Sequence, residues 1–147
     1  MRMIFVNLPV RDVARATAFY EAIGFTRNAA FSNDMASAMQ WSEAISVMLL
    51  DHRFYATFTD KPIADTHANS AALFCLSFDD RAQVDAIHAA ARDAGGRETR
   101  AIADQHFMYG GAFEDPDGHT WETVHMDMTA APPTDAAPAN TTPGDVV

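Results

Sequence analysis

Residues 113–127 read FEDPDGHTWETVHMD and contain the clearest local structural signal in the sequence. Its run Asp115-Pro116-Asp117-Gly118 combines a proline that presets φ with a glycine that permits positive φ, and this predicts a tight turn. We expect strands at 107–113 and 120–126 on either side of the turn, with Glu122 in the middle of the second strand. The role of this one strand carboxylate is therefore the first question that the sequence raises.

The same order of elements is written twice. A strand at 3–10 leads into a helix that Asp12 caps and Gly24 ends, and β-like pieces follow at 29–31, 36–41 and 45–50. A second strand at 72–78 leads into a helix that Asp80 caps and Gly95-Gly96 ends, and strands follow at 97–102, 107–113 and 120–126. The two caps are 80 − 12 = 68 residues apart. The sequence thus predicts an α+β fold of two βαβββ modules.

The domain boundaries follow from these repeats. We expect one domain over residues 1–128, made of module one (1–51), a linker (52–70) and module two (71–128). Residues 129–147 are rich in Pro, Ala and Thr and almost free of large apolar side chains, so they are predicted to be a disordered tail.

The composition excludes several classes of function. A net charge of −10 argues against nucleic acid and anionic membranes as partners, because both require clustered Lys and Arg. No apolar run approaches the ~20 residues of a membrane span, and the N-terminus lacks a signal-peptide cleavage pattern, so we expect a cytoplasmic protein. The single cysteine, Cys75, stands among apolar residues and is predicted to be a buried, inert thiol.

The motifs VNLPVRDVARATAFYEAIGF and FEDPDGHTWET give the chain a resemblance to the vicinal oxygen chelate superfamily. That group includes glyoxalase I, bleomycin-resistance proteins, fosfomycin-resistance enzymes and extradiol dioxygenases. The resemblance covers residues 1–127 and implies a glyoxalase/bleomycin-resistance-type half-barrel around a cavity, and a homodimer. It does not define a reaction, because one fold supports many chemistries.

The resemblance also implies where a metal would bind. In metal-dependent members, one residue from the first and one from the last strand of each module supply the ligands, typically His or Gln and Glu. By register these positions fall here on Phe5, Met48, Leu73 and Glu122. A phenyl ring and an isobutyl group have no donor atom, and a thioether is a weak one. We therefore expect no metal and no other cofactor.

A displaced metal site is the alternative, with Glu122 joined by His106, His125 or His52. Strand alternation puts His125 on the face opposite Glu122, which makes it a poor second ligand. The other histidines, His67, His88 and His119, are predicted to lie at the surface.

Alternation and the resemblance together give a predicted ligand cavity with apolar walls and a few polar groups. Its expected lining is Phe5, Asn7, Met48, Leu50, Phe54, Phe58, Leu73, Cys75, Met108, Tyr109, Glu122 and Met126. Trp121 is expected to pack behind this face. Asn7 is the expected neighbour of Glu122, because an unpaired buried carboxylate costs several kcal/mol.

Three functions remain open from the sequence. The first is a metal-independent protein that binds a partly apolar small molecule, similar to bleomycin-resistance proteins. The second is an enzyme, either metal-free, with Glu122 as general base and Asn7 or Tyr109 polarising a carbonyl, or a lyase or dioxygenase with an atypical metal site. The third is a scaffold without an open cavity.

Overall fold

A computed structural model describes residues 1–130 of the 147-residue chain. Most of the predicted tail, residues 131–147, lies outside the described part. None of the helices in residues 1–130 has the length and hydropathy needed to cross a bilayer.

Module one is a four-stranded sheet with one long helix. Its elements are β1 (Ile4–Val10), α1 (Val13–Ala22), β2 (Thr26–Asn28), a 3-10 helix η1 (Ala29–Phe31), β3 (Ala36–Ser42), β4 (Ile45–Asp51) and a short α2 (His52–Tyr55). The strand order is β1-β4-β3-β2, with β1 parallel to β4. The predicted strand at 29–31 is wrong: β2 ends at Asn28, whose side chain accepts a hydrogen bond from the Ala30 amide and starts η1.

Module two repeats this arrangement. It contains β5 (Leu73–Phe78), α3 (Arg81–Asp93), β6 (Arg97–Gln105), β7 (Met108–Glu114) and β8 (Thr120–Met126), in the order β5-β8-β7-β6. The register repeats as well, since Asn7 pairs with Met48 in one sheet as Cys75 pairs with Glu122 in the other. The predicted α+β fold of two βαβββ modules is confirmed.

Both long helices begin and end where the sequence predicts. Asp12 accepts a hydrogen bond from the Arg15 amide at 3.0 Å, and Asp80 accepts one from the Gln83 amide at 2.8 Å. Gly24 and Gly95 follow the helices with φ of +109° and +95°, a conformation that glycine adopts without strain.

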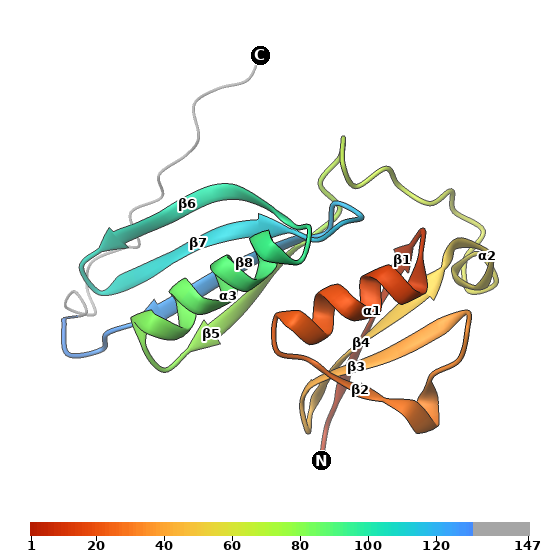
Figure 1. Cartoon of the computed structure of the whole chain (residues 1–147), viewed down its shortest axis with the longest axis horizontal. Helices are drawn as coiled ribbons and strands as arrows, with labels where there is room; N and C mark the ends of the chain where they lie inside the picture. Colours follow the sequence, from red (N-terminus) through yellow and green to blue (C-terminus); the bar gives the residue numbers. More distant parts are fainter. Residues whose placement is uncertain (131–147) are drawn as a thin grey trace.

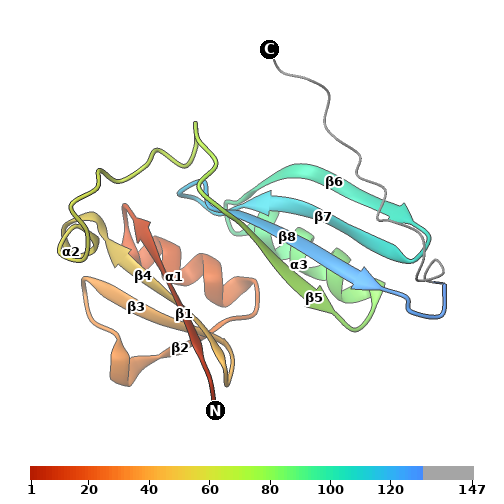
Figure 2. The same cartoon turned by 180° about the vertical axis from the view of Figure 1, so that it is seen from behind.

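The two helices lie on the same side of the molecule (Figure 1). Between them and the sheets lies one core with aromatic side chains from both modules, including Phe19 and Tyr20 of α1 and Trp121 of β8. The Tyr20 and Trp121 rings meet edge to face at 5.9 Å, so Trp121 packs behind the Glu122 face as predicted. Seen from behind, the sheets stand in front of the helices (Figure 2).

Candidate functional site

The predicted carboxylate lies on the sheet face of module two that points away from α3. Glu122 is beside Cys75 in the parallel β5–β8 pair, and Met108 pairs with Met126 further along the same face. Cys75, Met108 and Glu122 line a shallow hollow of about 80 Å³ together with Arg100 and Val124. Three of the predicted site residues therefore come together here.

Glu122 has a partner that the sequence did not indicate. Arg100 of β6 donates a hydrogen bond to its Oε1 at 3.1 Å, and the two side chains are 57% and 32% exposed for Arg100 and Glu122 respectively. The expectation of a buried carboxylate beside Asn7 is wrong on both points. The Glu122 side chain is partly exposed, and Asn7 belongs to the sheet of the other module. The pair presents a hydrogen-bond acceptor and a donor side by side on an apolar face.

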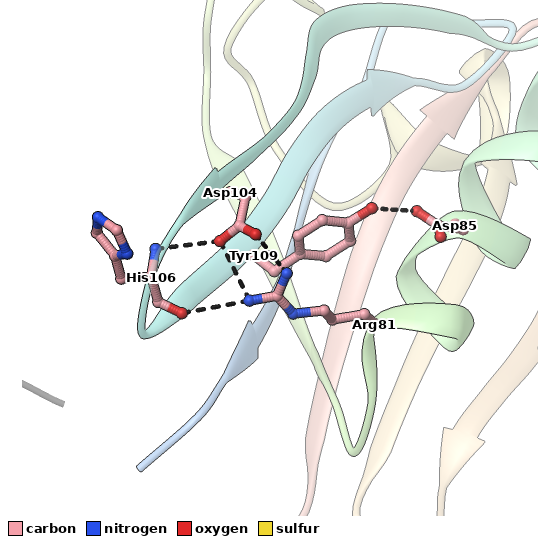
Figure 3. A network of polar contacts seen from close by, with 5 residues as sticks. All are labelled: Arg81, Asp85, Asp104, His106 and Tyr109. Carbon is pink, nitrogen blue, oxygen red and sulfur yellow. Dashed lines mark hydrogen bonds and ion pairs between the residues drawn. The ribbon is translucent and has the colours of Figure 1, made fainter. Parts of the chain in front are cut away.

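Tyr109 is on the wrong face for the predicted site. It pairs with His125 across β7 and β8, and its hydroxyl donates to Asp85 of α3 at 2.6 Å (Figure 3). The Arg81 guanidinium lies 4.9 Å from its ring centre. Tyr109 therefore cannot act on a molecule bound at Glu122.

Cys75 is exposed rather than buried, because its strand face is uncovered. Partial desolvation, and then the negative charge of Glu122, raise the pKa of its thiol. The predicted burial of Cys75 is therefore wrong, and a thiol with a raised pKa is the weaker nucleophile.

Among the described residues of a single chain, the sheet faces that carry the four predicted ligand positions are open. Phe5 and Leu73 are 57% and 58% exposed, while Met48 is half-buried. Leu50, at the end of β4, is buried. Leu50 therefore does not contribute to an open surface, and Phe5 and Leu73 are left uncovered by residues 1–130 of a single chain.

The remaining predicted residues lie elsewhere. Asn7 lines a cavity between the modules, together with Tyr55 of α2. The rings of Phe54 and Phe58 pack edge to face at 5.1 Å, and Phe58 remains 63% exposed. They lie at the start of the linker and are not part of the Glu122 hollow.

A buried polar cluster joins the two modules. The Tyr20 hydroxyl donates to Asp115 Oδ2 at 2.6 Å and accepts from Trp121 Nε1 at 3.0 Å. His119 Nε2 donates to the Pro9 carbonyl of β1 at 2.8 Å. Burial raises the pKa of Asp115 and, together with that carboxylate, raises the pKa of Tyr20.

Two histidines predicted at the surface are in fact buried. His119 belongs to the polar cluster just described, and His88 is fixed by Glu98 at 3.1 Å and by the Thr123 hydroxyl at 2.9 Å. Polar residues in a turn and on a helix are mostly exposed, so nothing in the sequence distinguished these two.

A family model described as "Glyoxalase/Bleomycin resistance protein/Dioxygenase superfamily" matches residues 2–123. The chain belongs to this superfamily. Solved structures similar to this chain include a hypothetical protein, SA1046, from S. aureus, with 21% identity over 85% of this chain and 94% of that one, at a TM-score of 0.73.

Two further solved structures illustrate the range of the superfamily. A glyoxalase/bleomycin resistance protein/dioxygenase family enzyme from Burkholderia phytofirmans PsJN is 18% identical over 86% of this chain and all of its own (100%), with a TM-score of 0.71. A bleomycin resistance determinant encoded on transposon Tn5 is 24% identical over 87% and 100% of the two chains, with a TM-score of 0.60. At such identities the likeness shows the fold alone. No curated protein sequence matches this chain.

The residues at the superfamily's metal positions do not fit a divalent metal. Phe5, Met48 and Leu73 offer no oxygen or nitrogen donor, which leaves Glu122 as the one usual ligand type. Within residues 1–130, no group of three or more His, Cys, Asp or Glu side chains is arranged to hold a metal ion. His125 Nδ1 is hydrogen-bonded to the Phe78 carbonyl at 3.0 Å. The side chains at these positions therefore give no basis for a metal-assisted reaction step.

Proposed function

We propose that this superfamily member binds a partly apolar small molecule on the Glu122 sheet face, without a metal. The observation that carries the proposal is the Arg100–Glu122 pair in the hollow beside Met108 and Val124. Binding sites for small molecules usually combine apolar walls with a few placed polar groups. The pair supplies one acceptor and one donor, which suits a head group such as an amide.

A second copy of the chain completes the site in this proposal. Phe5, Leu73 and Met126 are exposed by 57%, 58% and 49% on the open sheet faces. Large apolar side chains that are exposed together on a protein surface mark an interaction site. Covering these faces would turn the shallow hollow into an enclosed cavity and would exclude water from the ion pair, which strengthens its interaction with a ligand.

The metal-free enzyme is less well supported. Its general base, Glu122, would need a second group to polarise the substrate carbonyl. Tyr109 faces α3, and Asn7 lines a different cavity. Neither predicted second group lies with Glu122, so binding is the function that the geometry supports best.

The test is a fragment screen on the intact protein by NMR, using neutral and charged fragments of about ten heavy atoms. We expect binders to perturb the amides around Cys75, Met108 and Glu122. Glu122→Gln should weaken these binders about ten-fold, the loss expected for one charge-assisted hydrogen bond. Glu43→Gln removes the same charge from an exposed turn of module one and serves as the control. An unchanged fragment affinity in Glu122→Gln would contradict the proposal, and so would the absence of any fragment that binds this face.

A further inference from the structure

A second cavity lies at the seam between the two modules, and it shares no residue with the Glu122 hollow. Its volume is about 330 Å³, which is within the usual range for small-molecule sites. Residues 6–9 of β1 form one wall, Phe74 of β5 contributes to the other, and several residues between Thr59 and Ala72 of the linker complete the lining. Figure 1 shows the course of this linker from α2 to β5.

Most of the lining is apolar and comes from separate parts of the chain. Leu8 is contributed by β1, Tyr55 by α2, Ile63 by the linker and Phe74 by β5. Phe74 is held by the Trp121 ring at a centroid distance of 5.0 Å, so this wall is continuous with the core. Two aromatic rings and two aliphatic side chains provide surface for the apolar body of a ligand.

The linker is fixed over the cavity at one end. The Thr66 hydroxyl donates to the Asp117 carbonyl at 2.6 Å, and Gly118 lets the backbones approach so closely that a Cβ there would be 2.8 Å from the Thr66 carbonyl carbon. The hydrogen bond between His119 and the Pro9 carbonyl also connects the turn of module two to β1. The cavity is therefore defined by specific contacts on two sides.

The lining of this cavity contains one cationic side chain. Among residues 1–130, no Asp or Glu lines the cavity. Lys61, the one lysine in the sequence, does line it. None of the ion pairs among residues 1–130 involves Lys61. The Lys61 side chain is exposed and can reach an anionic ligand in this cavity. The other polar residues of the lining are Asn7, Thr59, Thr66, Asn69, Ser70, His119 and Thr120.

We propose that the inter-module cavity is a second ligand site, which takes a small monocarboxylate with an aromatic or branched apolar body. The carboxylate pairs with Lys61, and the body packs among Leu8, Ile63 and Phe74. A charge-assisted hydrogen bond from an ammonium group to a carboxylate is among the stronger polar contacts.

The probe is phenylacetate, compared with its neutral analogue phenylacetamide, and the measurement is amide NMR on the full chain. We expect phenylacetate to perturb residues 61–72 and 118–120 and phenylacetamide to perturb them far less. Lys61→Met should weaken phenylacetate binding about ten-fold or more, whereas Lys61→Arg should retain it. Arg53→Met removes a positive charge from α2 outside the cavity lining and should leave binding unchanged.

Three results would overturn this inference. They are equal perturbation by the acid and the amide, binding that Lys61→Met leaves intact, and no perturbation of the cavity residues up to about 10 mM, where fragments of this size are expected to bind. Perturbation by phenylacetate of the Glu122 face alone would count against this second cavity while supporting the first site.

Discussion

At the scale of single residues, the buried Tyr20 hydroxyl holds together groups from both modules. It donates to Asp115 and accepts from Trp121, and it is fully buried. By contrast, the Tyr109 hydroxyl makes one hydrogen bond, to Asp85, on the surface. The two tyrosines allow the effect of burial to be separated from the effect of losing a hydroxyl.

Tyr20→Phe should lower the free energy of unfolding by about 1–3 kcal/mol, because it leaves a buried carboxylate and an indole N–H each short of one partner. Tyr109→Phe should change it by no more than about 0.5 kcal/mol. Urea denaturation followed by circular dichroism measures both. Equal effects of the two changes would mean that the polar cluster does not stabilise the joint between the modules.

The position of Glu122 could be predicted from the sequence, because alternation along β8 is regular and Trp121 is an unmistakable core residue. Its partner Arg100 could not. The β6–β7 pairing shifts register between Glu98 and Arg100 and again between Arg100 and Ala103. Such bulges change which residues share a face, and no sequence pattern marks them here. Tyr109 is a different case: it follows Met108 directly in β7, so alternation alone places the two side chains on opposite faces, and only Met108 could share the Glu122 face.

At the scale of elements, the β6–β7 hairpin is fastened to the start of α3 (Figure 3). Arg81 pairs with Asp104 and also donates to the His106 carbonyl at 3.3 Å. His106 has a φ of +63° in this turn, and its amide donates to Asp104 at 3.1 Å. One carboxylate thus holds both the helix and the turn.

The hydrogen bond from Arg81 lowers the pKa of Asp104 below its usual 3.8. A lowered native pKa means that the stabilisation by this pair is present above the unfolded pKa and is lost as the pH falls through the native one. NMR titration of the Asp104 carboxyl should give a midpoint below 3.8, and Arg81→Met should raise it. Arg92→Met, on the same helix, should not. A midpoint at or above 3.8 in the wild type would show that the Arg81–Asp104 ion pair does not form.

The sequence predicted the ends of the helices and the Gly118 turn correctly, but it did not predict the segment at 29–31 or the inter-module cavity. The caps at Asp12 and Asp80 and the turn at Gly118 were correct because each depends on local backbone chemistry. The segment at 29–31 has strand-like composition, but the Asn28 side chain starts a 3-10 turn instead. The inter-module cavity depends on how a linker without regular pattern passes between distant strands, so alternation could not reveal it.

At the scale of the whole molecule, the open sheet faces require a partner in our account. Leu73→Asp should convert a dimer into a monomer, because it places a charge in the apolar face that a second copy covers. Light scattering coupled to size exclusion measures the mass. Phe31→Asp, at a similarly exposed site on η1 outside both sheets, is the control and should leave the dimer intact. A wild-type monomer at all concentrations would contradict this part of the proposal.

We propose that the Glu122 face binds an organic molecule and not a metal. The most direct measurement is elemental analysis of protein purified without chelators, together with thermal unfolding in Zn²⁺, Ni²⁺, Mn²⁺ and Fe²⁺. A metal that binds only the native state at about 100 times its Kd would add about 2.7 kcal/mol of stability. We predict no stoichiometric metal and no such shift in the wild type. One metal ion per chain that is lost in Glu122→Gln would contradict the account.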